Sequence, residues 1–370
     1  MENIGAKLNA YTSREHTVFY ANCFKNDIPN AVDILSDIIQ NSKIDEHNVE
    51  KERGVILREM EEVNSQMEEV VFDHLHSIAY QNTPLAYTIL GPEENIKKIS
   101  RNQLTDWIKT HYTGRRIVVA GAGGVDHDKL VDQVRKKFEN IPRMDRIDME
   151  NGPHNNTPFT GSMVTVRNDD EANQHIAIAV RSVGWSHPDS FVFSLIQAIV
   201  GNWDKSFGGS NNVVSRLCEK VATEKWASSL MSFNTTYKNT GLFGCYAVTH
   251  PGDHSTELTQ TIIKEWVRLA TRPTETELQR AKNRLKSMLL LQLDGSFSVA
   301  EDIGRQLLNI GRRMTPAEMF TRIDSITLED LKRVANEYLY DVDLAVVGVG
   351  AIKSIPDYNE LRGWTASWLI

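Results

Sequence analysis

The sequence contains little cysteine and no long apolar run. Its three cysteines, Cys23, Cys218 and Cys245, stand far apart, and none belongs to a Cys-x-x-Cys pair. This spacing argues against a cysteine-bound zinc site and against a disulfide framework, and it fits a reducing compartment. No stretch of about 18 consecutive apolar residues occurs, so the sequence predicts no transmembrane helix.

Positive charge is also in short supply. The chain has 41 Lys and Arg against 49 Asp and Glu, which gives a net charge of −8. That balance argues against nucleic acid as a partner and favours a basic one. The first residues, 1–4, resemble neither a signal peptide nor a basic amphipathic presequence. With 370 residues and 41% hydrophobic content, the chain is long enough for two or more domains with large cores.

The stretch from Asp45 to Ile78 predicts one long helix, opened by Asp45 as its N-cap. Apolar residues recur in it every seven positions and therefore form one column on the helix surface. They are Val49, Ile56, Val63 and Val70.

Acidic side chains border this apolar column. A second column lies three positions further on, and Glu69 extends it; its members are Glu52, Glu59, Gln66 and Asp73. A half-buried carboxylate needs a cation, a proton or a hydrogen-bond donor, so a metal ion or a basic ligand would suit this edge. Acid-rich helices are more often simply solvated, and that interpretation remains open.

Shorter elements follow from local patterns. A strand pair is expected in residues 7–24, and further strands at 117–120, 163–168 and 175–182. Helices are expected at 100–112, capped by Ser100, at 126–138, capped by Asp126, and at 188–201. Residues 140–160 are polar and contain Pro, Gly and Asn, which is typical of a linker.

The two halves of the chain repeat each other. Residues 99–123 match residues 326–350 without a gap, at an offset of 227. The long helix repeats at an offset of 229, at which Asp45 matches Thr274, and Thr274 and Glu277 form a capping-box pattern. The repeat predicts two homologous domains, at 1–145 and 160–370.

The repeat also bears on the acidic column. At the offset of 229 that matches the two copies of the long helix, Glu52 becomes Ala281 and Glu59 becomes Met288, so the helix does not require the acids and a functional role is favoured. Residues 160–223 have no counterpart in the first half. The first domain is therefore expected to lack a strand pair and a helix, and the chain resembles a truncated one.

Other motifs are weak. The turn at residues 118–128 lacks both the GxGxxG and the GK[ST] spacing, so it is interpreted as a strand–turn–helix connection rather than a phosphate loop. None of the eleven histidines belongs to an HExxH or HxxEH motif.

Several long segments carry a family resemblance. They are NAYTSREHTVFYA (9–21), VEKERGVILREMEEV (49–63), VVFDHLHSIAYQNTPL (70–85), ILGPEENIKKISR (89–101), VGNWDKSFGG (200–209) and LQLDGSFSVAEDIGRQ (291–306). These resemble the beta subunits of mitochondrial processing peptidase and core protein 1 of respiratory complex III, within the pitrilysin-like zinc metallopeptidases. The resemblance covers essentially the whole chain. It implies an α+β fold of two homologous domains, each a mixed or antiparallel sheet packed on helices, with the first domain incomplete.

The resemblance also implies roles for particular residues. Glu59 corresponds to the family's third zinc ligand, and Glu52 to a second essential glutamate of the catalytic site. Glu69 and Asp73 correspond to an acidic pocket for an arginine near the cleavage site, where charge-assisted pairs are strong and directional. The strand edge at Asn9, Ala10 and Tyr11 would receive an extended presequence by strand addition.

One departure limits the implied activity. The family's HxxEH motif supplies two zinc-ligand histidines and a general base, and this chain lacks it. Because water activation by zinc needs about three protein ligands and a base, the chain as given is expected neither to hold zinc nor to hydrolyse peptides.

Three functions stay open. The first is a processing-peptidase beta subunit that removes presequences from imported precursors. The others are a non-catalytic core subunit 1 of ubiquinol–cytochrome c reductase and a presequence-binding paralogue. The implied partners are an alpha-type processing peptidase subunit or core protein 2, presequence peptides with basic residues, and complex III. The implied location is the mitochondrial matrix or the matrix side of the inner membrane.

Overall fold

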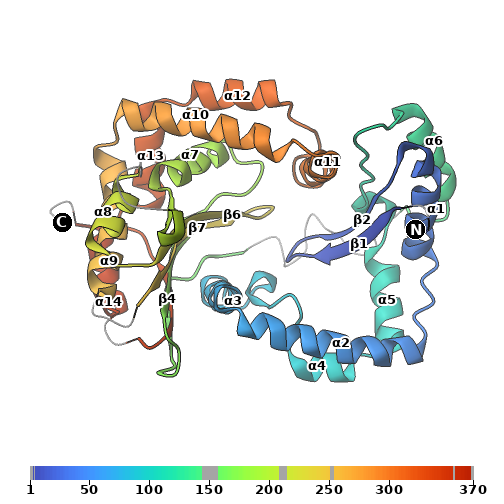
Figure 1. Cartoon of the computed structure of the whole chain (residues 1–370), viewed down its shortest axis with the longest axis horizontal. Coiled ribbons are helices and arrows are strands. Elements are labelled where there is room, and N and C mark those ends of the chain that lie inside the picture. The colour runs from blue at the N-terminus through green and yellow to red at the C-terminus, as the bar shows by residue number, and fades with distance from the viewer. Residues whose placement is uncertain are drawn as a thin grey trace. The chain divides into compact units, whose positions relative to one another are not determined.

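The chain forms two compact units, each built from three separate segments. The computed structural model describes residues 3, 5–143, 157–207, 215–250, 254–352 and 355–367. Unit 1 comprises residues 1–62, 88–155 and 290–314, and unit 2 comprises residues 63–87, 156–289 and 315–370. Figure 1 shows the elements of both units.

Unit 2 is organised around a six-stranded sheet with the order β3-β8-β4-β7-β6-β5. The strands are β3 (Ser162–Arg167), β4 (Gln174–Ser182), β5 (Asn202–Asp204), β6 (Ser229–Thr236), β7 (Gly241–Thr249) and β8 (Ala345–Gly350). β3 and β8 pair in parallel, whereas the other pairs are antiparallel. The predicted α+β class with a mixed sheet is confirmed.

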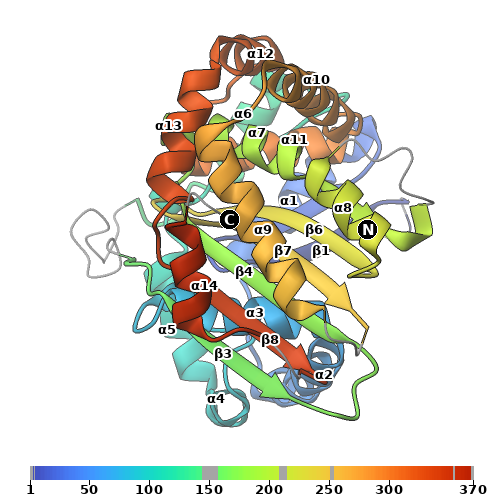
Figure 2. The same ribbon diagram turned by 90° about the vertical axis from the view of Figure 1, so that its left-hand side faces the viewer.

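Helices cover both faces of this sheet. They are α3 (Met67–Ala79), α7 (Ser190–Val200), α8 (Arg216–Glu224), α9 (Ser255–Thr271), α10 (Glu275–Gln292), α12 (Pro316–Ser325), α13 (Leu328–Tyr338) and α14 (Tyr358–Thr365). In Figure 2, α9, α13 and α14 lie in front of the sheet and α3 lies behind it.

The central strand β4 shows why helices pack on both faces of the sheet. Ile176 and Ile178 point into a core shared with α7, α8 and α9, whereas Ala177 and Ala179 point into a second core shared with α3. All four are at most 1% exposed. A continuous apolar run with no alternation is the pattern of a strand buried on both faces.

Unit 1 contains a hairpin with helices around it. The strands β1 (Lys7–Thr12) and β2 (Thr17–Asn22) pair antiparallel and form a two-stranded sheet, which confirms the predicted strand pair. The helices are α1 (Ile28–Gln40), α2 (Glu46–Ser65), α4 (Glu93–Lys98), α5 (Arg101–His111), α6 (His127–Lys137) and α11 (Ser296–Ile310).

Each compact unit contains one helix whose sequence belongs to the repeat that forms most of the other unit. α11 belongs to unit 1, and α3 belongs to unit 2. Shifted back by 227 positions, α11 would begin at residue 69, within α3, so the two helices are repeat equivalents. The boundaries of the two compact units therefore differ from the boundaries of the two sequence repeats. The domain limits of 1–145 and 160–370 describe the repeats and remain a prediction.

The expected single helix over 45–78 is wrong. Gln66 adopts an extended conformation, with φ −94° and ψ 100°, and separates α2 from α3. None of the residues of α2 is buried, whereas α3 buries Val71, Leu75 and Ala79. The heptad pattern misses this break because its apolar positions continue through Val63 and Val70 on either side of Gln66.

The expected strand at 117–120 is not formed. No strand is assigned there, and none of the backbone hydrogen bonds among the described residues involves 117–123. The matching segment of the second repeat, β8, has a strand on each side. A β-prone sequence without a partner strand cannot complete a ladder, so the difference reflects pairing rather than propensity.

The predicted caps at Ser100, Asp126 and Thr274 are confirmed, whereas Asp45 as an N-cap stays a prediction. Ser100 forms a capping box with Gln103 at the start of α5. The Asp126 side chain accepts a hydrogen bond from Lys129 N at the start of α6. The Thr274 hydroxyl donates to Glu277 Oε2 over 2.8 Å before α10. Of the predicted linker, residues 144–156 lie outside the described residues.

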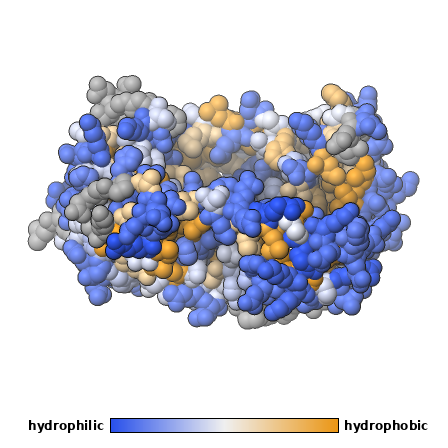
Figure 3. All heavy atoms as spheres, turned by 60° about the horizontal axis from the view of Figure 1, so that its bottom comes forward, coloured by the Kyte–Doolittle hydropathy of each residue, from blue (hydrophilic) through white to orange (hydrophobic). Residues whose placement is uncertain are grey.

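One face of the molecule is mostly polar: the face drawn in Figure 3 is covered largely by hydrophilic residues, with apolar side chains between them. Within the described ranges, no helix has the length and hydropathy needed to cross a membrane.

Candidate functional site

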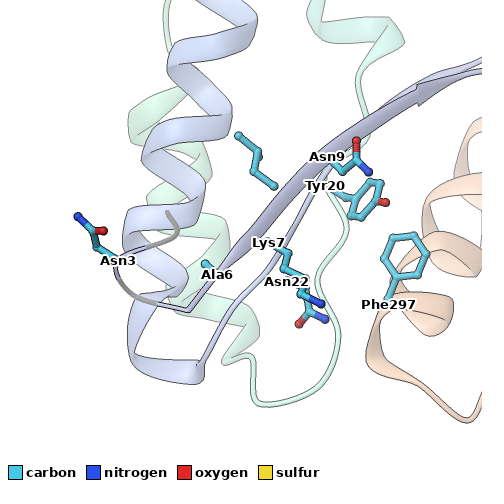
Figure 4. A pocket seen from close by; sticks show the side chains of 8 residues that line it. Asn3, Ala6, Lys7, Asn9, Tyr20, Asn22 and Phe297 are labelled. Carbon is cyan, nitrogen blue, oxygen red and sulfur yellow. The ribbon is translucent and has the colours of Figure 1, made fainter. Parts of the chain in front are cut away.

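A pocket opens on one face of the β1–β2 hairpin. Strand pairing places Asn9 opposite Tyr20 and Lys7 opposite Asn22, so these four side chains share a face. With Phe297 of α11, they line an open pocket of about 920 Å³ (Figure 4). The pocket therefore combines amide, ammonium and aromatic groups, which suits a polar peptide better than an apolar ligand.

The predicted strand-addition residues lie on β1 beside this pocket. Asn9, Ala10 and Tyr11 are all exposed, and Asn9 Oδ1 accepts a hydrogen bond from Ala10 N over 2.8 Å. The Tyr11 hydroxyl donates to Glu301 Oε1 of α11 over 2.7 Å. Burial and this hydrogen bond to a carboxylate raise the pKa of Tyr11 to about 12. Sequence analysis missed Glu301, because it lies 290 positions away.

Glu52 and Glu59 lie on α2, and both are exposed. Seven positions on one helix place them on the same side, about 10 Å apart along the axis. The expectation that these acids are half-buried is wrong, because α2 buries none of its residues. Arg53 connects α2 to α4 and the residue that follows it, because its guanidinium donates hydrogen bonds to the carbonyl oxygens of Ile96 and Ile99.

Glu69 and Asp73 lie four positions apart on α3, one turn from each other. Glu69 is exposed, whereas Asp73 is half-buried as expected. Carboxylates at this spacing can reach a common cation. Because α3 belongs to unit 2, this pair lies in a different compact unit from Glu52 and Glu59.

A buried histidine holds α3 on the sheet of unit 2. His76 is 3% exposed, and its Nδ1 lies 2.6 Å from the Phe72 carbonyl oxygen. Because a carbonyl only accepts, Nδ1 carries the proton and Nε2 accepts from the Tyr237 hydroxyl, 2.5 Å away. The Phe72 ring also packs edge-on against Phe233, with ring centroids 4.9 Å apart. Nothing in the local pattern around His76 indicated this role.

The described residues do not by themselves fit a zinc site. Across the described part of the chain, no three His, Cys, Asp or Glu residues are grouped so that they could hold a metal ion. Glu59 is a suitable oxygen donor, but one exposed carboxylate supplies only one of the three or four ligands that zinc takes from proteins. We therefore derive no catalytic step through zinc.

Family models match both parts of the chain. The model described as insulinase, peptidase family M16, matches residues 1–93, and that of the peptidase M16 inactive domain matches residues 98–285. The chain belongs to peptidase family M16. Members of this family are zinc metallopeptidases.

Individual relatives are similar over nearly the whole chain. The beta subunit of mitochondrial-processing peptidase from Lentinula edodes is 48% identical over 100% of this chain and 80% of its own length. The human beta subunit is 48% identical over 100% of this chain and 75% of its own length. The Dictyostelium discoideum beta subunit is 46% identical over 99% and 78%, respectively.

A solved structure has the same M16 fold. A chain of the structure titled "Complex III2 from Candida albicans, Inz-5 bound" superposes with a TM-score of 0.89 at 27% identity. The match covers 98% of this chain and 86% of that one.

Proposed function

We propose that this chain is a beta-type subunit of a mitochondrial processing peptidase that works with an alpha-type subunit on presequences of imported precursors. The observation that carries the proposal is the 46–48% identity to such beta subunits over essentially the whole chain. The same similarity supports a mitochondrial location, and we propose the matrix or the matrix side of the inner membrane.

In this proposal the presequence is bound at two places. The outer edge of β1 at Asn9–Tyr11 adds an extended peptide as a strand, and the neighbouring pocket receives its side chains. Glu69 and Asp73 receive the guanidinium of an arginine. The acidic first turn of α3, with Glu68 beside Glu69, adds further negative charge for a basic segment.

Glu59 is proposed as a zinc ligand and Glu52 as a supporting carboxylate. The remaining ligands and a general base would have to come from residues outside 1–370, because HxxEH does not occur in the sequence. The chain alone is therefore expected to purify without stoichiometric zinc, as measured by elemental analysis. One zinc per chain, lost in Glu59→Gln, would contradict this part of the proposal.

The test is binding of a labelled presequence peptide to the complex with the alpha-type subunit. Glu69→Gln combined with Asp73→Asn is expected to weaken binding about tenfold, since a charge-assisted pair with arginine is lost. A peptide with citrulline in place of that arginine should bind wild type and variant equally. Glu61→Gln, an exposed acid on α2, is the matched control. Equal affinity of wild type and double variant for the arginine peptide would overturn the pocket assignment.

A second candidate function is supported by the structural match to a chain of the complex III structure, with its TM-score of 0.89. A core subunit would migrate with ubiquinol–cytochrome c reductase in blue-native electrophoresis of mitochondrial membranes. A processing-peptidase subunit would instead migrate in a smaller complex with an alpha-type subunit. Co-migration with the reductase alone would favour the core function over our first proposal.

A further inference from the structure

The helix α3 carries its acidic pair and a buried histidine in one row. Glu69 and Asp73 are four positions apart, and His76 follows three positions later. At about 100° per residue, Glu69 and His76 lie on nearly the same side of the helix, with Asp73 between them along the axis. Exposure falls along this row, because Glu69 is exposed, Asp73 is half-buried and His76 is 3% exposed. The acidic pair therefore adjoins the surface of α3 that packs on the sheet.

Both ring nitrogens of His76 are hydrogen-bonded. Nδ1 donates to the carbonyl oxygen of Phe72 over 2.6 Å, and Nε2 accepts from the Tyr237 hydroxyl, 2.5 Å away. Tyr237 directly follows β6, and its own backbone is held at both polar groups. Its N–H donates to the Thr240 carbonyl oxygen over 2.8 Å, and its carbonyl oxygen accepts from Trp185 N over 3.0 Å. The hydrogen-bond donor to His76 thus has a fixed position on the sheet.

Aromatic rings pack this side of α3 against β6 and β7. The centroid of the Phe72 ring lies 4.9 Å from that of Phe233 and 5.9 Å from that of Tyr246. One turn later, the ring centroids of His76 and Tyr237 are 5.8 Å apart. Apolar packing holds the helix against the sheet but is non-directional, whereas a hydrogen bond depends on angle as well as distance. The hydrogen bond between Tyr237 and His76 is therefore the contact that sets how far α3 is turned about its axis.

The rotation of α3 matters for binding a guanidinium. Side chains reach about 5–6 Å from a helix axis, so a rotation of about 20° would move each carboxylate of the acidic pair by about 2 Å. The range of N–H···O distances in hydrogen bonds is only about 0.5 Å wide. Restoring both bonds after such a rotation would require less favourable rotamers. One guanidinium can therefore bind Glu69 and Asp73 together, in relaxed rotamers, only over a narrow range of helix rotations.

We propose that His76 is the positioning residue of the Glu69–Asp73 pair and that it determines specificity for arginine without touching the peptide. The hydrogen bond from Tyr237 sets the rotation of α3 at which both carboxylates reach one guanidinium. This inference rests on the proposed function, because it concerns the arginine pocket assigned there. All four residues belong to unit 2, which contains the whole pocket and its support.

The test measures arginine preference, defined for a labelled presequence peptide as the dissociation constant of its citrulline form divided by that of its arginine form. Binding is followed by fluorescence anisotropy, with the full chain in complex with the alpha-type subunit. The wild-type complex is expected to prefer arginine about tenfold. Tyr237→Phe removes the donor to His76 and should reduce the preference to about threefold or less, through weaker binding of the arginine peptide alone.

Two variants of His76 separate the hydrogen bond from the volume of the ring. His76→Leu removes both ring nitrogens and should also reduce the preference to about threefold or less. His76→Gln keeps an acceptor for the Tyr237 hydroxyl and should retain a preference closer to that of the wild type. If the melting temperature shows that His76→Leu does not fold, Tyr237→Phe and His76→Gln carry the test.

A matched control loses a buried hydrogen bond on the other face of the same sheet. Ser232 is 1% exposed, and its hydroxyl donates to the Gln197 carbonyl oxygen of α7 over 3.1 Å. Ser232→Ala is therefore expected to lower the melting temperature, as Tyr237→Phe does, yet to keep the tenfold preference for arginine. A purely structural role of Tyr237 would instead make the two variants alike in both measurements.

Failure of this inference and failure of the proposed function give different results. If the wild-type complex does not prefer arginine, the pocket of the proposed function is wrong and the positioning role falls with it. If the wild type prefers arginine but folded Tyr237→Phe and His76→Leu keep that preference, only the positioning role is overturned. An equal loss of preference in Ser232→Ala would also overturn it, because any loss of stability would then have the same effect.

Discussion

His76 Nε2 and the Tyr237 hydroxyl lie 2.5 Å apart, although 161 residues separate them in the sequence. The pair joins α3 to the turn between β6 and β7, and it fixes the proton of His76 on Nδ1. Two residues of one unit that come from different repeats are thus hydrogen-bonded in its interior.

Removing the donor of this hydrogen bond should destabilise unit 2. Tyr237→Phe is expected to lower the free energy of unfolding by about 1–2 kcal/mol, because a buried acceptor loses its donor. Denaturant unfolding followed by circular dichroism measures the change. Tyr87→Phe is the control, since Tyr87 is 70% exposed and should change stability by less than about 0.5 kcal/mol. Equal effects of the two substitutions would argue against a stabilising hydrogen bond.

His175 is expected to make stability depend on pH. Burial lowers the pKa of this imidazole, although Glu171 opposes the shift, and its Nδ1 lies 2.7 Å from the Tyr246 hydroxyl. Because the folded pKa lies below the unfolded value of about 6.5, the unfolded chain binds the proton more tightly. Stability contributed by the neutral ring is therefore present above that pH and lost as pH falls toward the folded pKa.

The measurement is the melting temperature between pH 7.5 and pH 5. His175→Gln should lose less melting temperature over this range than the wild type does. His127→Gln, which changes an exposed histidine, should follow the wild-type curve. A variant curve parallel to the wild type for His175→Gln would contradict the prediction.

Arg268 connects two buried carboxylates. Its guanidinium donates to Glu265 over 2.7 Å and to Glu277 over 2.8 Å, joining α9 to the start of α10. Both glutamates are at most 8% exposed. Arg268→Met should cost about 3–5 kcal/mol of stability, since both charges lose their buried partner. Adding Glu265→Gln and Glu277→Gln to the variant should recover part of the loss; no recovery would exclude uncompensated charge as the cause.

The acids of α2 should be dispensable for folding. Glu52→Ala and Glu59→Met introduce the residues of the second repeat at exposed positions. The double variant is expected to stay within about 0.5 kcal/mol of the wild-type free energy of unfolding. Loss of more than about 2 kcal/mol, measured by denaturant titration, would show that these carboxylates stabilise the fold and weaken the case for a functional role.

How far the sequence predicts a structural feature depends on whether the interactions that form this feature are local in the chain. The caps at Ser100 and Asp126 were predictable because a side chain and a backbone N–H three residues later suffice. The break at Gln66 was not, because α3 turns toward a sheet whose strands come from residues 162–350. The prediction of a strand at 117–120 failed for the same reason, since pairing requires a second strand from elsewhere in the chain.

The candidate site shows the same division. The local pattern of residues 7–24 placed Asn9, Ala10 and Tyr11 on a strand, as the structure has them. The apolar periodicity of residues 45–78 placed Glu52, Glu59, Glu69 and Asp73 on a helix, but their burial depends on packing, and only Asp73 is half-buried. Glu301 and His76 escaped prediction because their partners lie 290 and 161 positions away.

The membership of α11 in unit 1 has a consequence for synthesis of the chain on the ribosome. The hairpin of unit 1 is complete at residue 22, but the helix that covers it begins at residue 296. At about 5–20 residues per second, the hairpin waits on the order of 15–60 s for that helix. The unit translated first is therefore completed late, and its strands need protection from other nascent chains during that interval.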